Sequence, residues 1–522
     1  MKFTRIRNPL AGWRDWEPNP IVVKELRQAV RSWAVTGMLL LFLAVLFVVS
    51  IGFFVVDADA GPDQPMGAAM FTAFAVVLGV ASMFFIPLYL GIRVGAERQD
   101  NNSDLLYVST LSPARIILGK FLCGAYIAVL FFSACMPFMA FTNLLRGVDL
   151  PTIFFILFYL FLIVCGINMM AIFFGCIPAS RPIKSFLAML GAFSCIYLIG
   201  AVLNSAFVYL RFGMGTTMGG LAFWLTTSAE VAVGAAVTGL FYMMSVALVS
   251  PLSSNRALPL RLYITSLWFL TGLLSVAWSA NRSHSNTLST WAVAMTLLLL
   301  GSLVVVLSNS DTLSQRVRRA IPRQRWKRFM VFPFFNGAAG GLVWVGTMTA
   351  ATLLVFSRVS AVFPARAWSP SAWLSLIAAV CYVFAYALTA LFIHRTFFPN
   401  RTPKIAGLLA GIITAISGLA PSVVLFFMNH LSINSIERLE LGNVFNIFSM
   451  RDDNHLIYHI YFSAGWLAVA VLLNARWFGR QVRSFVPPPK EAPPVIGYET
   501  ETANRVGTVA RAASANVPPG AS

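Results

Sequence analysis

The sequence predicts an all-α polytopic membrane protein with about twelve transmembrane helices, cytoplasmic N- and C-termini and an interfacial amphipathic helix near the N-terminus. Composition points to a membrane protein, because 58% of the 522 residues are hydrophobic and only 11% are charged, whereas soluble domains carry about 25% charged residues. Apolar runs also recur along the chain at the length of about 20 residues that crosses a bilayer. Finally, lysine and arginine gather in alternate connecting segments.

Twelve apolar runs carry the predicted helices. They lie at residues 34–56, 66–91, 116–142, 151–177, 185–210, 221–249, 262–280, 290–308, 332–357, 371–393, 405–428 and 457–475. The first run exceeds the roughly 7–15 apolar residues of a signal peptide, so we expect it to be an uncleaved membrane helix.

The distribution of cations predicts the orientation. With the N-terminus inside, the inner segments hold 31 of the 38 Lys and Arg residues and the outer segments hold the other seven. Because cytoplasmic loops are enriched in these residues, both termini are expected in the cytoplasm of a multi-pass protein of the cell (inner) membrane. The net charge of +19 then reflects loops that face anionic lipid, and no nucleic-acid partner is needed to explain it.

Residues 20–33 are expected to form a helix that lies in the membrane interface, since Asn19 suits its N-cap and Pro20 its first turn. Apolar side chains (Val22, Leu26, Ala29, Val30 and Trp33) recur on one face, and polar, mostly cationic ones (Lys24, Arg27, Gln28 and Arg31) on the other. The candidate interfacial residues are Asn19, Pro20, Lys24, Glu25, Arg27 and Arg31, with anionic lipid as the partner. The alternative is an ordinary basic flank that only sets topology.

The polar segment 97–120, between the second and third apolar runs, is more elaborate than a simple connector. Ser103 can cap a short helix over 104–110, and Ser112 and Pro113 suit the N-cap and first position of the next helix. The segment therefore predicts a short helix, a break and the entrance of a membrane helix, and we expect a soluble partner to dock on it.

This pattern resembles the first cytoplasmic loop of ABC-2 type transporter permeases, the membrane subunits of certain ATP-driven ABC transporters. The matching residues are Glu97, the pairs Leu105-Leu106 and Ser112-Pro113, and Gly119-Lys120. Many family members carry Gly-Thr before the paired leucines, where this chain has Asn102-Ser103. The resemblance covers about residues 19–250 and includes the Asn-Pro start of the interfacial helix.

The resemblance implies that loop 97–113 is a coupling helix that receives a separate ABC ATPase subunit, which binds ATP and Mg. The docking residues would be Glu97, Asp104, Leu105, Leu106, Leu111, Ser112 and Pro113. It also implies that the first six helices form a homodimer or pair with a related permease subunit, and that substrate is exported at their interface.

An acid at membrane depth is a further candidate. Residues 205–228 are apolar but broken by glycines, which suits re-entrant pieces buried against protein and is similar to the family. Glu230 follows and is the only acid well inside a predicted membrane segment, so it is a candidate for the transport pathway. The alternative is a solvated acid near the outer interface.

The predicted domains are a cytoplasmic N-terminus at 1–33, a six-helix ABC-2-like permease domain at 34–250, a further six-helix domain at 251–484 and a disordered cytoplasmic tail at 485–522. The second half contains no second copy of the Glu…Leu-Leu…Ser-Pro pattern. Its loop 309–331 instead holds seven Lys and Arg residues between positions 316 and 328. We expect a lipid-facing belt there, or alternatively a docking surface for an acidic partner.

Missing motifs narrow the function. The sequence contains no GxxxxGK[ST] phosphate loop and no nucleophile-plus-base arrangement, so we expect no enzyme activity and no cofactor in this chain. The histidines lack metal-ligand spacing, so no metal site is expected. The alternatives to an ABC permease are a twelve-helix secondary carrier and a non-transporting membrane scaffold. The carrier is disfavoured because the loop between helices two and three lacks the Gly-x3-Asp-Arg-x-Gly-Arg-Arg pattern of that superfamily.

Overall fold

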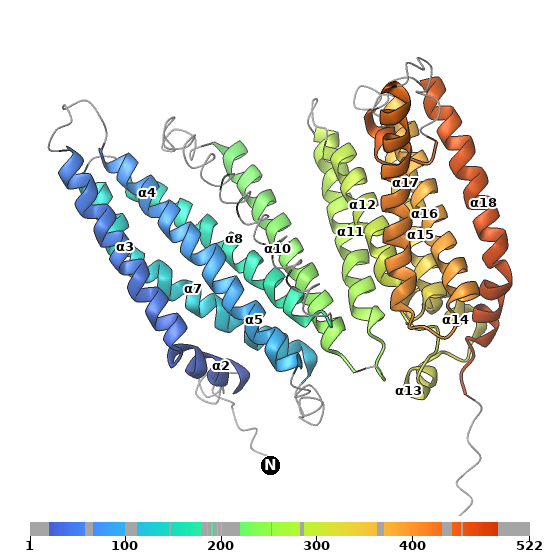
Figure 1. Ribbon diagram of the computed structural model, residues 1–522, viewed down its shortest axis with the longest axis horizontal. Helices are drawn as coiled ribbons and strands as arrows, with labels where there is room; N and C mark the ends of the chain where they lie inside the picture. Colours follow the sequence, from blue (N-terminus) through green and yellow to red (C-terminus); the bar gives the residue numbers. More distant parts are fainter. Residues whose placement is uncertain are drawn as a thin grey trace, which may run out of the picture. The chain divides into compact units, whose positions relative to one another are not determined.

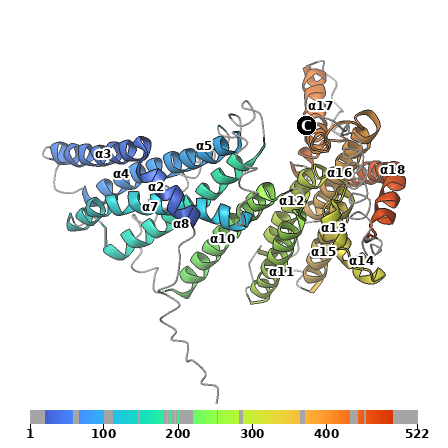
Figure 2. The same ribbon diagram turned by 90° about the horizontal axis from the view of Figure 1, so that it is seen from below.

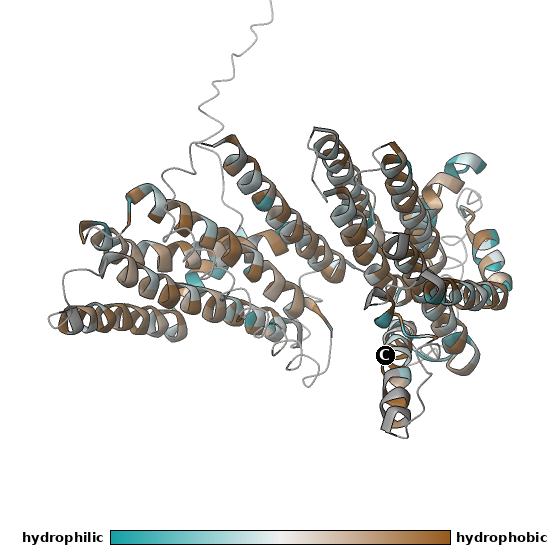
Figure 3. Ribbon diagram, turned by 90° about the horizontal axis from the view of Figure 1, so that it is seen from above, coloured by the Kyte–Doolittle hydropathy of each residue, from teal (hydrophilic) through white to brown (hydrophobic). Residues whose placement is uncertain are grey.

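The part of the chain that the computed structural model describes consists of helices joined by short turns and irregular segments, without strands. That part comprises residues 20–57, 66–99, 112–145, 148–178, 220–251, 253–281, 287–362, 370–430, 441–449 and 453–488, together with positions 185, 189, 191, 196 and 200. Eleven helices in these ranges are long and apolar enough to cross a membrane, and Figure 3 shows hydrophobic residues along them. The chain is therefore an all-α, multi-pass membrane protein.

The eleven helices coincide with eleven of the twelve predicted apolar runs. The remaining run, 185–210, lies outside the described residues apart from single positions.

The chain divides into two compact units. The first comprises Met1–Leu252 and Arg256–Trp291, and the second Ser253–Asn255 and Ala292–Ser522. The sequence-based boundary at residue 250 assigned the helix Ala257–Asn281 (α11) to the second half. In the structure α11 packs on Leu221–Val249 (α10), where the Tyr263 hydroxyl donates a 2.8 Å hydrogen bond to the Ala236 carbonyl.

The first unit contains one short helix and a set of long ones (Figure 1). Besides α10 and α11 these are α2 (Pro20–Val30), α3 (Trp33–Asp57), α4 (Met66–Val80), α5 (Ile86–Gln99), α7 (Pro113–Leu144) and α8 (Leu150–Cys176). Figures 1 and 2 show α2 turned away from α3 at one end of the unit, as expected for a helix that does not cross the bilayer.

Aromatic side chains and small residues pack the long helices of the first unit. Phe42 of α3 and Phe131 of α7 lie with ring centroids 5.3 Å apart in the buried core. On the other side, α5 and α8 approach so closely that a Cβ atom on Gly175 would lie 2.9 Å from the Gly91 carbonyl oxygen. Small residues permit this close approach of membrane helices.

The span that contains α4 and α5 is interrupted by a π-helical turn at Ala81–Phe85. Pro87 follows it, and a proline cannot donate to the carbonyl four residues earlier, which here belongs to Met83. The wide turn accommodates this defect, while the Ser82 hydroxyl donates to the Leu78 carbonyl at 2.6 Å.

The second unit contains the remaining helices. They are α12 (Thr287–Leu307, which begins in the first unit), α13 (Gln315–Arg319), α14 (Arg325–Val331), the 3-10 turn Phe332–Phe334, α15 (Ala338–Val362), α16 (Pro370–Phe397), α17 (Lys404–His430), the 3-10 turn Asn446–Ser449 and α18 (Asp453–Ser484). The predicted run 332–357 began too early, because Phe332–Phe334 form a 3-10 turn and Gly337 (φ +121°) lies between that turn and the start of α15.

Polar side chains join α16 and α18 along the core of the second unit. The Trp466 indole donates to the Thr389 hydroxyl at 3.0 Å, and Arg395 donates to the Asn474 side chain at 3.0 Å. Deeper in the unit, the Tyr382 hydroxyl lies 3.1 Å from His459 Nδ1. Such hydrogen bonds help to hold transmembrane helices together, because lipid tails are as apolar as the helix surfaces and the hydrophobic effect does not drive the helices into contact.

A small apolar cluster closes one end of the second unit. It buries Val317, Ile321, Phe335 and Phe485, and Val331 and Phe332 pack against it. The Phe485 ring lies 5.1 Å from that of Phe332 and 5.2 Å from that of Phe335. The disordered tail was predicted to begin at residue 485, but Phe485 is buried in this cluster. Residues 489–522 of the predicted tail lie outside the described part.

A candidate ionic site under the N-terminal helix

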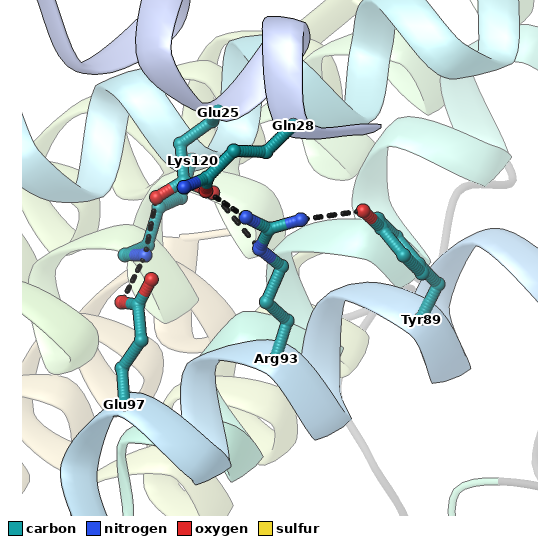
Figure 4. Close-up of polar contacts among 6 residues, drawn as sticks. All are labelled: Glu25, Gln28, Tyr89, Arg93, Glu97 and Lys120. Carbon is teal, nitrogen blue, oxygen red and sulfur yellow. Dashed lines mark hydrogen bonds and ion pairs between the residues drawn. The ribbon is translucent and has the colours of Figure 1, made fainter. Parts of the chain in front are cut away.

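Four charged side chains from three helices converge beneath α2 (Figure 4). Glu25 comes from α2, Arg93 and Glu97 from α5, and Lys120 from α7. Two are acids and two are cations, so together they carry no net charge. We call these four residues the ionic cluster.

Glu25 is the centre of the ionic cluster, because its two carboxylate oxygens hold different cations. One oxygen lies 3.2 Å from Arg93 Nε and the other 3.0 Å from Lys120 Nζ. Lys120 reaches in turn to Glu97, with its Nζ 2.6 Å from the carboxylate. The lysine therefore bridges an acid of the surface helix and an acid at the end of α5.

Two uncharged side chains also accept hydrogen bonds from Arg93. Its guanidinium donates to the Tyr89 hydroxyl at 2.6 Å and to the Gln28 side-chain oxygen. Gln28 lies one helical turn after Glu25, so Arg93 binds two positions on the same side of α2. This arrangement fixes the rotation of α2 about its own axis as well as its position.

Burial makes the ionic cluster energetically important. The side chains of Glu25 and Lys120 retain only 5% and 8% of their accessible surface, whereas Arg93 and Glu97 retain 24% and 30%. Removing one partner of a buried ion pair costs about 3–5 kcal/mol, because an uncompensated charge stays behind. Pairs between exposed groups contribute at most about 1 kcal/mol. The Glu25–Lys120 contact should therefore contribute most of the stability that the ionic cluster provides.

Two residues of the ionic cluster lie close to the predicted docking loop in the sequence, Glu97 at its start and Lys120 in the helix that follows it. Glu97 closes the second span, and after the loop Ser112 and Pro113 begin α7 as predicted. The Ser112 hydroxyl accepts the Arg115 amide at 3.4 Å, which is a long capping contact. Four of the predicted docking residues, Asp104, Leu105, Leu106 and Leu111, lie outside the described residues.

The faces of the N-terminal helix differ from the prediction. We expected its apolar residues to share one membrane face, but Val22 and Ala29 are buried against the protein together with Glu25. Val30 and Trp33, from the same predicted face, remain 62% and 89% exposed, and Trp33 already belongs to α3.

The other interfacial candidates fall outside the ionic cluster. Lys24, Arg27 and Arg31 are exposed as predicted, and so is Pro20 at the start of α2. Asn19 lies outside the described residues. The helix therefore keeps a cationic exposed side, while its acid faces inward.

Sequence reasoning missed the roles of Arg93 and Lys120. The sequence alone assigns no role to Arg93, and it marks Lys120 only as part of the Gly119-Lys120 pair. A usable signal was present: Arg93 and Glu97 are four residues apart and share one helix face at the end of an apolar run. Charges in such positions tend to be paired, but spacing cannot identify a partner on another helix.

Glu230 lies apart from the ionic cluster, on α10. It is exposed, and its carboxylate accepts a hydrogen bond from the Tyr159 hydroxyl of α8. An exposed carboxylate in a membrane-spanning helix requires water or a partner outside the described part of its unit. The glycine-rich stretch before α10 lies largely outside the described residues.

Comparison with known proteins finds no match to this chain among family models, curated proteins or solved structures. The functional argument therefore depends on the sequence pattern and the geometry described above.

Proposed function

We propose that this chain is the membrane-embedded permease subunit of an ATP-driven ABC transporter of the ABC-2 type, with export as its direction. A separate ATPase subunit binds loop 97–113, hydrolyses ATP and supplies the force. Two copies of the first unit, or one copy with a related subunit, enclose the transport pathway.

The observation that best supports this proposal is the bridge from Glu25 through Lys120 to Glu97. A loop that receives mechanical work must be connected rigidly to the helices it moves. Here the helix before the loop (α5), the helix after it (α7) and α2 share one set of paired charges, of which Glu25 and Lys120 are buried. A displacement at either end of the loop would be transmitted to all three helices.

The direct test is co-purification with a candidate ABC ATPase subunit, to be sought among the products of neighbouring genes. Changing Leu105→Asp and Leu106→Asp together would place two carboxylates in the proposed apolar contact, where desolvating an unpaired charge is costly. We expect the recovered ATPase to fall by at least about tenfold, which corresponds to a loss of 1.4 kcal/mol or more. Transport in reconstituted vesicles should fall with it.

A matched control changes Asn101→Ser and Asn102→Ser, which keeps the same loop polar. This variant should bind the ATPase as the unmodified chain does. If the double leucine variant retains full ATPase binding and stimulation, loop 97–113 is not the docking surface. Transport by the purified chain alone, driven by an ion gradient, would instead identify a secondary carrier.

Glu230 is proposed to line the transport pathway of the same protein. Glu230→Gln preserves the size of the side chain and its ability to accept from Tyr159 while removing the charge. We expect slower transport with unchanged ATPase binding. Unchanged transport would exclude Glu230 from the mechanism.

A further inference from the structure

The basic segment between α12 and α15 is folded onto the second unit, rather than being a loose connection (Figure 1). Ser314 caps α13 and its hydroxyl donates to the Ser253 carbonyl at 3.1 Å. The Asn255 and Asn336 side chains donate to the carbonyls of Phe334 and Ser254 at 3.1 Å and 2.9 Å. Together with the buried cluster around Phe485, these contacts hold α14 in a defined orientation.

The side of α14 that faces away from the protein is apolar. Trp326, Phe329 and Met330 keep 65%, 74% and 62% of their surface exposed. They are spaced i, i+3 and i+4, so they share one side of the helix. Val331 packs against the buried cluster from the opposite side. Three large apolar side chains are thus held outward by a helix whose other side is fixed.

Cations flank this apolar side. Arg325 and Lys327 lie to either side of it on the helical wheel and are exposed, and the Lys327 ammonium lies 5.5 Å from the centre of the Trp326 ring. Between residues 309 and 337 the sequence has seven cations and a single acid, Asp311. Asp311 already has two hydrogen-bond donors within the protein: its carboxylate accepts hydrogen bonds from the Ala338 backbone amide at 3.3 Å and from the Trp477 indole at 3.1 Å.

We propose that α14 is a second membrane-interface helix, which inserts Trp326, Phe329 and Met330 between anionic phospholipid headgroups while its cations bind their phosphates. An apolar side flanked by lysine and arginine is the arrangement of helices that lie in the interface. The position along the chain agrees, because α14 lies between two membrane spans that end at Leu307 and begin at Ala338. A docking site for an acidic protein requires the cations but leaves the outward aromatic residues unexplained.

The test places a nitroxide spin label on α14 in the full chain, reconstituted in lipid vesicles after its native cysteines are replaced by alanine. Met330→Cys carries the label on the apolar side, and Gln324→Cys carries it at the exposed N-cap as the matched control. Collision rates are measured with oxygen, which concentrates in lipid, and with a water-soluble nickel complex. The vesicles contain phosphatidylcholine alone or phosphatidylcholine with phosphatidylglycerol.

We expect the label at 330 to collide mainly with oxygen and the label at 324 mainly with nickel, with the contrast larger when phosphatidylglycerol is present. Adding Arg325→Gln and Lys327→Gln should weaken the phosphatidylglycerol effect about fivefold for each charge removed. If the label at 330 faces water in both bilayers, the proposal is overturned, and a docking site for an acidic protein becomes the better explanation of this surface. Equal lipid burial in both bilayers would overturn the preference for anionic lipid.

Discussion

The two surface helices α2 and α14 are fastened to their units by different forces. On α2 the inward contact is ionic, since Glu25 binds Arg93 and Lys120. On α14 it is apolar, since Val331 and the adjoining Phe332 pack on Phe485. Both helices keep cations exposed. Two helices with similar exposed cations can thus be attached to the protein by different contacts. We call the contacts of Glu25 the ionic anchor and those around Phe485 the apolar anchor, and we expect them to respond differently to substitution and pH.

The largest effect is expected at the ionic anchor. Glu25→Gln leaves Lys120 and Arg93 without their shared carboxylate, and the loss of a buried partner should lower the free energy of unfolding by about 3–5 kcal/mol. Reversible unfolding in mixed detergent micelles measures the total change in the free energy of unfolding. Hydrogen exchange of the α2 amides shows whether the loss is local to the first unit.

The neighbouring residue supplies the control for this experiment. Lys24→Gln removes an exposed charge from the same helix and should change the free energy of unfolding by less than about 0.5 kcal/mol. Equal effects of the two substitutions would show that the ionic cluster does not fasten α2.

A somewhat smaller effect is expected at the apolar anchor. Phe485→Ala removes a ring that is 4% exposed and packs on two others, so the free energy of unfolding should fall by about 3 kcal/mol. Faster hydrogen exchange should be confined to residues 313–335, with α2 unchanged. Phe397→Ala, at a phenylalanine that is 69% exposed, is the matched control and should have little effect. If α2 were released together with α14, the two anchors would not be independent.

The smallest effect concerns pH, through Asp311, the single acid in the sequence between residues 309 and 337. Burial raises the pKa of the Asp311 carboxyl above its ordinary value, although hydrogen bonds from Trp477 and Ala338 oppose the rise. The folded chain therefore binds this proton more readily than the unfolded chain. Stability should rise as pH falls through the folded pKa and decline as pH rises again.

The matched variant for the pH effect is Asp311→Asn, which does not titrate. The difference in unfolding free energy between the unmodified chain and this variant should shift in favour of the unmodified chain on mild acidification. A shift in the opposite direction would contradict a raised pKa. Measurements at neutral and mildly acidic pH in the same micelles provide the comparison.

Much of the architecture could be predicted from the sequence, because a bilayer requires long apolar helices and limits where they can end. Ser112 and Pro113 began α7 as expected, since capping depends on local chemistry alone. The start of α15 was displaced because an apolar run does not reveal that Phe332–Phe334 belong to a 3-10 turn.

The contacts of the ionic cluster could not be predicted, because they depend on which helices lie together. The sequence predicts Glu25 on a helix that lies in the membrane interface, yet its side chain faces inward because Arg93 and Lys120 lie beneath α2. For the basic segment before α15 the sequence predicts a lipid-facing belt, but it does not reveal which residues attach that segment to the protein. Its inward contacts are made by Val317 and Ile321, whose partner Phe485 lies far along the chain.

The π turn at Ala81–Phe85 has a geometric consequence for the ionic cluster. A π turn inserts one extra residue into a helix, and each residue advances an α-helix by about 100°. Without it, an uninterrupted helix would point Arg93 and Glu97 about a quarter-turn away from their present directions. The pairing of charges under α2 thus depends on a register shift elsewhere in the same span, at the π turn that precedes Pro87.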